Sequence, residues 1–487
     1  MDRGVSDRNE KGVALPLALF ALVMLSGLLL AFLSMSAMEP EIAANLGDVT
    51  RARYVAESGI EWAFDQLASN PNWNQILLGP DNASGTADDG LMTLAGGQTL
   101  PAPLNNAAFG IFSAQVRNDN QVGDLALTGQ PIDGGVVGGN PTNDTNGVVI
   151  LTASGTYRGV TRQIQVVLRR LNLPPFPGAY SMPGVQSDLL FNNSAFSIDG
   201  RDYVCTANCT NPDFNSRTYG LKANQANMKY GLAVEPGVQQ NLGNPSTTTY
   251  EQRAEQGFNS VAKRNNVIGK DQTNPGGPAV TGLNTVAADP GLTPAVMQNF
   301  LTQLASFSGT TVLQSTIACP MVLTGSAGNP PTSTPTLTNG CGVSQTLDLG
   351  TRQNPKLVYF RGELDPSSAF TGLRLQSKIQ GAGILVVEDG DLRTFGEFKW
   401  DGIVIVTGRY VSSIFDRGSQ VNIIGATVAN ETVACEGGGG SCPANPFPGT
   451  YYDGYFNATN VTLRNSQESL DNVQRKLLFK MSTWREI

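Results

Sequence analysis

Hydrophobic residues follow two different patterns in the N-terminal part of the chain. From Val13 to Met38 the sequence reads VALPLALFALVMLSGLLLAFLSMSAM, an apolar run without a charged side chain. A helix of that length is about 39 Å long, which is enough to cross a bilayer. The sequence therefore predicts a membrane-spanning first half of a helix, preceded by a short charged leader at residues 1–12.

An amphipathic pattern follows this apolar run. Apolar residues recur at steps of four and three and form one stripe, which only Arg53 interrupts. Asn70 and Pro71 end the pattern, because a proline disfavours helical backbone at the residue before it. The sequence thus predicts one helix over residues 13–69, about 85 Å long if straight, with a kink at Pro40. Its apolar stripe comprises Ile42, Leu46, Val49, Ala56, Ile60, Ala63 and Leu67.

Residues 70–172 predict a small antiparallel sheet after the helix. Three β-rich runs occur there, at residues 109–116, 147–157 and 161–171, and Arg158-Gly159-Val160 between the last two is typical of a hairpin. Residues 173–178 read LPPFPG, a stiff extended connector that marks a domain boundary.

The rest of the chain divides by composition. Residues 179–355 are rich in Asn, Thr, Gly and Pro and predict a loop-rich region with one helix at residues 293–307. Residues 356–487 contain four β-rich runs and predict a β-rich C-terminal domain. Ile384, Ile403 and Ile423 recur at nearly equal spacing, which suits the coils of a right-handed β-solenoid or a stacked sheet edge, while an ordinary sandwich fits about as well.

The end of the chain, SLDNVQRKLLFKMSTWREI, has apolar residues at helical spacing. The fold class is therefore α+β: a long N-terminal helix, an antiparallel sheet, and a large mainly-β region for which a solenoid is one of the open architectures. The helical positions of the last segment are Leu470, Val473, Leu477 and Leu478.

Composition excludes most catalytic chemistry. The chain has no histidine, so the usual general base and the usual zinc ligand are absent. Ser260 and Lys263 match a Ser-x-x-Lys pattern, but the partner motifs of acyl-transfer enzymes do not follow, so we interpret the match as chance. A formal net charge of -8 disfavours nucleic acid as a partner. No enzymatic activity is predicted.

The six cysteines form three close pairs along the chain. An even number suits disulfides in an exported protein. Fifteen pairings are open to six cysteines, and we predict the nearest-neighbour one. The predicted pairs are Cys205 with Cys209, Cys319 with Cys341, and Cys435 with Cys442.

Oxygen-rich loops provide the one candidate cofactor. Acidic and amide side chains gather at residues 81–89, 118–124 and 143–146, and these are the hard ligands that calcium prefers. None of the loops has the EF-hand spacing, and Asn and Asp are also common in ordinary turns. No cofactor is required, and calcium is the hypothesis, with Asp119, Asp124 and Asp144 as its ligands.

The junction Lys11-Gly12-Val13 joins the charged leader directly to the apolar run. This junction resembles the leader of type IV pilins and pseudopilins. The resemblance implies that a prepilin peptidase cuts after Gly12 on the cytoplasmic side and methylates the new N-terminus at Val13. If the helix begins at Val13, the amide missing at Pro16 is one of the first four and has no intrahelical partner to lose. A secretory signal or a plain signal anchor is the alternative.

Leu17 departs from the pilin pattern. Most pilins have glutamate at this fifth mature position, so the chain lacks the carboxylate that would neutralise the terminal amine of a neighbouring subunit. The K-type pseudopilins of type II secretion also lack it and sit at the filament tip. The resemblance therefore implies an initiating subunit.

The segment ARYVAESGIEWAFDQL at residues 52–67 resembles the corresponding helix of PilX-like minor pilins. The resemblance implies a minor pilin of a bacterial type IV pilus, at or near the filament tip, that promotes pilus assembly and adhesion. It implies a single-pass inner-membrane protein whose bulk is periplasmic before it joins the pilus on the cell surface. Its partners would be other major and minor pilins, the prepilin peptidase and the inner-membrane assembly platform.

Two alternatives stay open. One is the K-type tip pseudopilin of a type II secretion system. The other is a membrane-anchored extracellular protein that binds or cleaves carbohydrate, which would need paired carboxylates in one cleft. The nearest candidates for such a pair are Glu363, Asp365, Glu388, Asp389 and Asp391.

Overall fold

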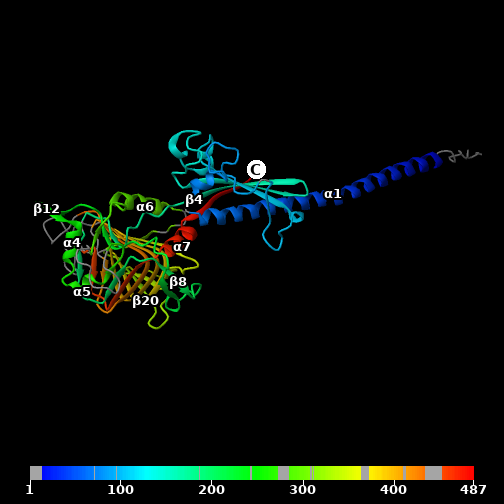
Figure 1. Cartoon of the computed structure of the whole chain (residues 1–487). Helices are drawn as coiled ribbons and strands as arrows, with labels where there is room; N and C mark the ends of the chain where they lie inside the picture. The colour runs from blue at the N-terminus through cyan, green and yellow to red at the C-terminus, as the bar shows by residue number, and fades with distance from the viewer. Residues whose placement is uncertain are drawn as a thin grey trace, which may run out of the picture. The chain divides into compact units, whose positions relative to one another are not determined.

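The computed structural model divides the chain into two compact units (Figure 1). The first comprises residues 1–169 and 481–487, and the second comprises residues 170–480. The structure describes residues 14–70, 72–94, 96–185, 187–241, 244–271, 285–307, 310, 312–363, 372–409, 413–433 and 452–487.

The first unit is built on one long helix, α1 (Ala14–Ser69), which continues through Pro40. Over the residues that the structure describes, this matches the predicted helix of residues 13–69. α1 is long and apolar enough to cross a membrane, and none of its most apolar stretch is buried within the structure. Further along, the predicted stripe is buried from Ala56 onward, at Ile60, Ala63 and Leu67.

An antiparallel sheet covers the second half of α1. The strand order is β1 (Gln98–Thr99), β2 (Ile111–Asn118), β3 (Val148–Tyr157), β4 (Val160–Arg170) and β26 (Phe479–Glu486). Gly155 on β3 lies directly against the α1 backbone, where a Cβ would collide with Ala52 and Ala56. The predicted α+β layout of a long helix and an antiparallel sheet is thereby confirmed. The remaining elements of this unit are α2 (Trp73–Leu77), η1 (Ala107–Phe109), α3 (Asp124–Thr128) and η2 (Asp133–Gly135).

β26 corrects the predicted domain boundaries. The sequence predicts one C-terminal domain over residues 356–487, but the last residues return to the first unit and complete its sheet. The amide of Ile487 donates to the carbonyl of Gln163 at 3.0 Å, and the Arg485 side chain bonds Gln165. The second unit is therefore an insertion between β4 and β26.

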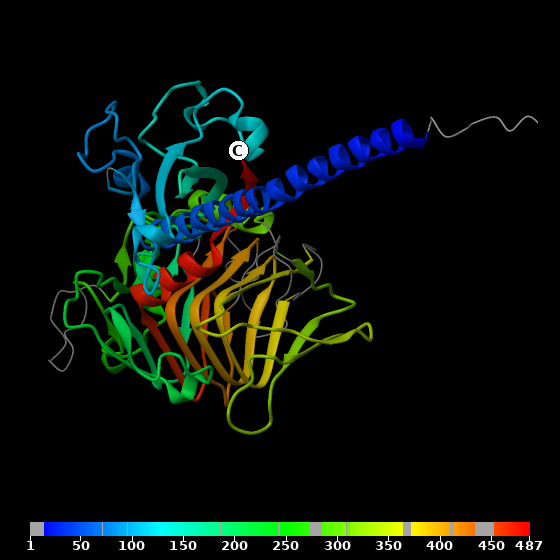
Figure 2. The same ribbon diagram turned by 90° about the vertical axis from the view of Figure 1, so that its right-hand side faces the viewer.

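The second unit is a β-solenoid whose neighbouring strands run parallel on three faces (Figure 2). This decides between the two architectures left open by the sequence, because a sandwich would pair antiparallel strands. Three strands bend and contribute to more than one face: β20 (Gly372–Glu388), β21 (Asp391–Gly408) and β23 (Gln420–Glu431).

Face 1 contains the C-terminal parts of these three strands. The other strands of face 1 are β15 (Val312–Gln314), β19 (Lys356–Arg361), β5 (Gly178–Met182), β10 (Tyr230–Val234) and β14 (Ala287–Ala288). Besides parts of the bent strands, face 2 contains β25 (Asn460–Asn465), β7 (Phe196–Asp199) and β13 (Val267–Ile268). Besides parts of β20 and β21, face 3 contains β16 (Met321–Thr324), β22 (Ser413–Phe415), β24 (Gly454–Phe456) and β6 (Leu189–Phe191).

The predicted boundary at residue 355 is wrong. β5 pairs with β23, and β15 pairs with β19, so residues 179–355 provide coils of the same solenoid. The chain enters the solenoid at β5, in the middle of the stack, and forms coils toward the end at β14. It then crosses to β15 at the opposite end, and the later coils stack one after another until they reach β5. These strands are short and their pairing is long-range, so local periodicity could not reveal them.

Ile384 and Ile403 are paired in the register of the solenoid, but Ile423 is not part of that column. The residue that pairs with Ile403 is Ala426, while Ile423 lies on face 2 beside Trp400. The coil that leads from Ile403 to Ala426 is therefore longer than the one that leads from Ile384 to Ile403. The nearly equal spacing of the three isoleucines combines positions on two different faces and is a coincidence.

A glycine column forms the bend between faces 2 and 1. Gly383, Gly402 and Gly425 are in register and have φ angles of 121°, 137° and 138°. A Cβ on Gly402 would strike the carbonyl oxygen of Gly383, and one on Gly425 would strike that of Gly402. Only glycine combines this backbone conformation with such close stacking.

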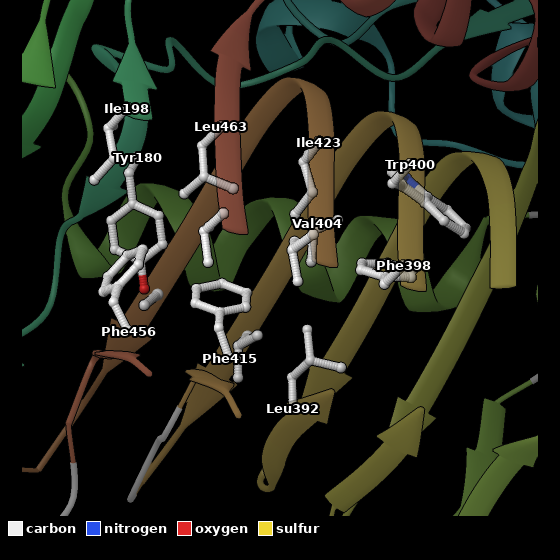
Figure 3. Close-up of a cluster of buried hydrophobic side chains, with 14 of the residues drawn as sticks. Tyr180, Ile198, Leu392, Phe398, Trp400, Val404, Phe415, Ile423, Phe456 and Leu463 are labelled. Atoms are coloured by element: carbon white, nitrogen blue, oxygen red, sulfur yellow. The ribbon is translucent and has the colours of Figure 1, made fainter. Parts of the chain in front are cut away.

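Face 1 is buried on both sides. Its inward side chains join the large core shown in Figure 3, where Trp400, Phe398, Phe415 and Phe456 fill the interior. Its outward side chains, such as Ile384 and Val386, are covered by α6 (Pro294–Ser306) and α7 (Gln467–Leu477). This explains the nearly continuous apolar runs in the sequence, which strands buried on two sides require.

The helices α6 and α7 confirm the two helical patterns predicted at residues 293–307 and in the C-terminal segment. The other elements of the second unit cover its ends and the outside of its faces. They are β8 (Tyr203–Ala207), η3 (Phe214–Ser216), β9 (Thr218–Leu221), β11 (Val238–Asn241), β12 (Asn244–Thr249), α4 (Tyr250–Gln256), α5 (Val261–Arg264), β17 (Thr336–Asn339) and β18 (Ser344–Thr346).

Candidate functional site

The exposed apolar half of α1 is the most distinctive surface of the first unit. Leu17 is 65% exposed and Met38 is 60% exposed, and the large apolar side chains between them are exposed to a similar degree. Pro16 lies in the first turn of the described part of α1. Gly12 and Val13 lie outside the described residues. So large an apolar surface requires lipid or other apolar helices around it.

The predicted calcium ligands lie in one loop region, but the structure separates one of them from the others. Asp119 lies near Asp133 and Asp144, which both repel its negative charge. Asp124 instead forms a two-point ion pair with Arg117, with both contacts at 2.7 Å. Burial would raise the pKa of Asp124, but the Arg117 guanidinium lowers it.

Asp119 is fully buried, and among the described residues its carboxylate contacts the Asn146 amide rather than a cationic side chain. Burial raises the pKa of Asp119 to about 6. A hydrogen bond from the Asn146 amide opposes this increase, and repulsion from Asp133 adds to it. Asp133 accepts bonds from Asn118 and Thr145, at 2.8 Å and 2.9 Å. Asp133 was missed in the sequence because it lies between the two predicted loops, in a Gly-rich turn with no ligand-like spacing.

Within the described ranges, no group of three or more acidic or cysteine side chains is positioned to hold a metal ion. Calcium binding therefore stays a prediction, with Asp119 and Asp144 as the ligands that the fold leaves near one another. A cavity of about 330 Å³ opens next to this region, and its lining includes Gln115, Arg117 and Asn120.

Among the residues that the structure describes there are two disulfides, each between neighbouring cysteines in the sequence. Cys205 is bonded to Cys209 at the β8–β9 hairpin, and Cys319 is bonded to Cys341 across β16 and β17. Their Cα atoms are 5.8 Å and 5.2 Å apart. Cys435 and Cys442 lie outside the described residues.

The residues considered for catalysis have structural roles. The Ser260 hydroxyl accepts the amide of Lys263 at the start of α5, and the Lys263 ammonium donates to the carbonyl of Phe191. Glu388 accepts from the Tyr359 hydroxyl at 2.8 Å and from Arg361 at 2.6 Å.

The other described carboxylates of the carbohydrate hypothesis lie at the β20–β21 turn and just after β19. Burial and the adjacent Glu388 raise the pKa of Asp389. Asp391 is buried at the start of β21, Glu363 accepts the amide of Ile317, and Asp365 lies outside the described residues.

A buried charge network anchors the β8–β9 hairpin to the solenoid. The Asp401 carboxylate accepts from Arg217 at 2.7 Å, from Arg352 at 2.9 Å, and from the Tyr219 hydroxyl at 2.5 Å. Arg352 also reaches Glu468 on α7 at 2.7 Å. Burial, with Asp401 alongside, raises the pKa of Tyr219 far above its ordinary value. No local pattern signals this network, because its members come from widely separated segments of the chain.

Comparison with known proteins identifies no family. No protein-family model matches the chain, and no curated protein matches it. One solved structure that is similar to it is the competence-associated pilin ComZ from Thermus thermophilus, which is 12% identical. That match covers 90% of this chain and 97% of the other, with a TM-score of 0.21. At so low a TM-score the match carries no argument about this chain.

Proposed function

We propose that this protein is a minor pilin of a bacterial type IV pilus, incorporated at or near the filament tip, where it promotes assembly and presents an adhesive surface. The observation that carries the proposal is the divided character of α1. Its first half is apolar and exposed, whereas its second half is buried against the antiparallel sheet. A helix of this kind can leave lipid and pack among similar helices without unfolding the unit that it carries.

The same helix sets the expected location and partners. Before assembly the protein would be held in the inner membrane by one span, with its bulk in the periplasm. After cleavage behind Gly12 and methylation of Val13, it would join other pilins through the assembly platform and reach the cell surface. A helix that begins at Val13 would have Pro16 in its first turn, where a missing amide costs no hydrogen bond, and this supports the proposed cleavage site.

Two features support a terminal position in the filament. Leu17 cannot neutralise the terminal amine of another subunit, so a first subunit tolerates it best. The second unit, residues 170–480, is much larger than the sheet into which it is inserted. Repeated stacking of such a unit around a thin fibre is sterically unfavourable, whereas one copy at the end is not.

The test is mass spectrometry of the N-terminus of protein purified from native membranes or pili. We expect a chain that begins with methylated Val13. The variant Gly12→Val should keep its leader and reduce the number of surface fibres, while the matched variant Gly4→Val in the same leader should be processed normally. An intact Met1 in the wild type, or normal piliation with uncleaved Gly12→Val, would contradict the proposal.

A second candidate is the K-type tip pseudopilin of a type II secretion system, which Leu17 favours equally. Deletion of the gene separates the two functions. If surface fibres are lost and protein secretion stays normal, the pilus function is supported. If the fibres are retained and secreted proteins are trapped in the periplasm, the type II secretion function is supported.

A further inference from the structure

Three side chains from two distant segments meet on the outside of face 2. Lys399 and Glu397 are two residues apart on β21, so both point to the same side of the strand. Asn215 belongs to η3, between β8 and β9. The Lys399 ammonium contacts both the Oδ1 atom of Asn215 and the Oε1 atom of Glu397. The same Oε1 atom lies 3.4 Å from the Nδ2 atom of Asn215, so each group touches the other two.

The strand groups are largely shielded from solvent. The side chain of Lys399 is 16% exposed and that of Glu397 is 12% exposed. Little water can therefore compete for the contact between Lys399 and Glu397. A neutral amine next to an amide carbon is a nucleophile.

Asn215 is fixed in place by contacts on both sides of η3. The amide of Phe214 donates to Gln380 at 2.7 Å, and Gln380 is the register partner of Lys399 on β20. Arg217, two residues beyond Asn215, binds Asp401 on β21. The reacting side chains are therefore held together by the fold, which is the main requirement for a slow intramolecular reaction.

We propose that Lys399 and Asn215 form an intramolecular amide cross-link, with Glu397 as the catalytic acid–base. Glu397 takes a proton from the Lys399 ammonium, and the free amine attacks Cγ of Asn215. The Nζ–Cγ bond forms and the Cγ–Nδ2 bond breaks. Nδ2 leaves with the two protons that Nζ has lost, relayed by Glu397, and departs as ammonium. The carboxylate of Glu397 is regenerated, and no oxidant or further reactant is needed.

The cross-link would join positions 184 residues apart in the sequence. It would fasten the β8–β9 hairpin covalently to the coil formed by β21. The hairpin and the coil would then separate only if a covalent bond broke. Hydrogen bonds and the Asp401 network alone do not hold two segments together in this way under sustained mechanical load.

The chain provides a matched control at Lys378, whose register partner on β21 is Glu397. Lys378 donates to the Oδ1 atom of Asn329 at 2.8 Å, but its ammonium lies 3.9 Å from Glu397. Among the described residues, Lys378 thus has a lysine–asparagine contact without a carboxylate in hydrogen-bond distance of its nitrogen. It should not react.

The experiment is intact-mass measurement of the reduced full-length chain, followed by peptide sequencing. We expect the wild type to be one ammonia lighter than its sequence mass, with a branched peptide that joins residues 215 and 399. Lys399→Arg and Asn215→Ala should restore the full mass, Glu397→Gln should slow or abolish the loss, and Lys378→Arg should leave it unchanged.

Three results would overturn the proposal. The first is a wild type with its full mass and no branched peptide. The second is a branched peptide that joins Lys378 to Asn329 instead. The third is conversion of Asn215 to aspartate, which would show that water and not Lys399 attacks the amide. All three are read on the folded wild type, so none depends on the stability of a variant.

Discussion

Asp119 shows how a single buried carboxyl sets a pH dependence. Its pKa in the folded chain, about 6, is above the ordinary value of 3.8, so the folded state binds the proton more tightly than the unfolded state does. Stability is therefore gained as the pH falls from about 6 toward 4 and lost as the pH rises through the same window. We expect Asp119→Asn to stabilise the first unit at pH 7.5 and to flatten the melting temperature between pH 4 and pH 6, measured by circular dichroism.

Calcium provides the control for this prediction. If Asp119 and Asp144 bind calcium, millimolar calcium should raise the melting temperature of the wild type and leave that of Asp119→Asn unchanged. An equal effect of calcium on both proteins would contradict the calcium hypothesis. A wild type and variant with the same pH profile without calcium would contradict the assignment of the titration to Asp119.

Asp401 is the residue on which the buried network depends. Asp401→Asn would leave the guanidinium groups of Arg217 and Arg352 buried without their shared carboxylate. We expect a loss of about 3–5 kcal/mol in the free energy of unfolding of the second unit, as for other broken buried pairs. Urea denaturation measures this loss.

The matched control is Asp348→Asn, which weakens the exposed pair between Asp348 and Lys356 and should cost less than about 1 kcal/mol. Similar losses for both variants would mean that the network is not effectively buried.

At the scale of elements, the glycine column is the feature that decides the shape of the solenoid. Gly402→Ala places a methyl group against the carbonyl of Gly383 at a φ of 137°, so we expect a loss of at least about 2 kcal/mol. Gly418 has a φ of 85° but no atom within 4 Å of an added Cβ. Gly418→Ala should therefore cost only the backbone term of about 1 kcal/mol. Equal losses in urea denaturation would show that close stacking contributes nothing.

The α1 helix and β26 show why some elements are predictable and others are not. α1 has a continuous apolar run and a regular stripe, so its ends follow from local sequence. β26 has exposed side chains along most of its length and no strong alternation. It becomes a strand because β4 offers it an unpaired edge, and β4 lies far earlier in the chain, on the other side of the whole second unit.

At the scale of the whole molecule, the second unit has the connections of an inserted domain. The amide of Leu171, near its start, donates to the carbonyl of Leu478, near its end, at 3.0 Å. Its core lies within residues 170–480 and includes Trp400 and Phe456. A unit with its own core and adjacent ends is expected to fold by itself.

We therefore expect residues 170–480, expressed alone in an oxidising compartment, to unfold cooperatively at the same temperature as in the full chain. The complementary variant replaces residues 172–477 with a short Gly/Ser linker and should keep the five-stranded sheet, because the two ends are within hydrogen-bond distance. Circular dichroism and calorimetry measure both. An isolated second unit that aggregates or melts without cooperativity would contradict this division.

Features that depend on neighbours along the chain could be predicted before the fold was known. These are the membrane-length helix, the strands of the β3–β4 hairpin, the helices α6 and α7, and the exclusion of histidine chemistry, since periodicity and composition are local properties. Folding in three dimensions was needed to reveal the order of the coils, the return of β26, the Asp401 network and the meeting of Lys399 with Asn215. Each of these depends on contacts between residues that are far apart in the sequence, and strand pairing and buried charge leave no local pattern from which such partners can be read.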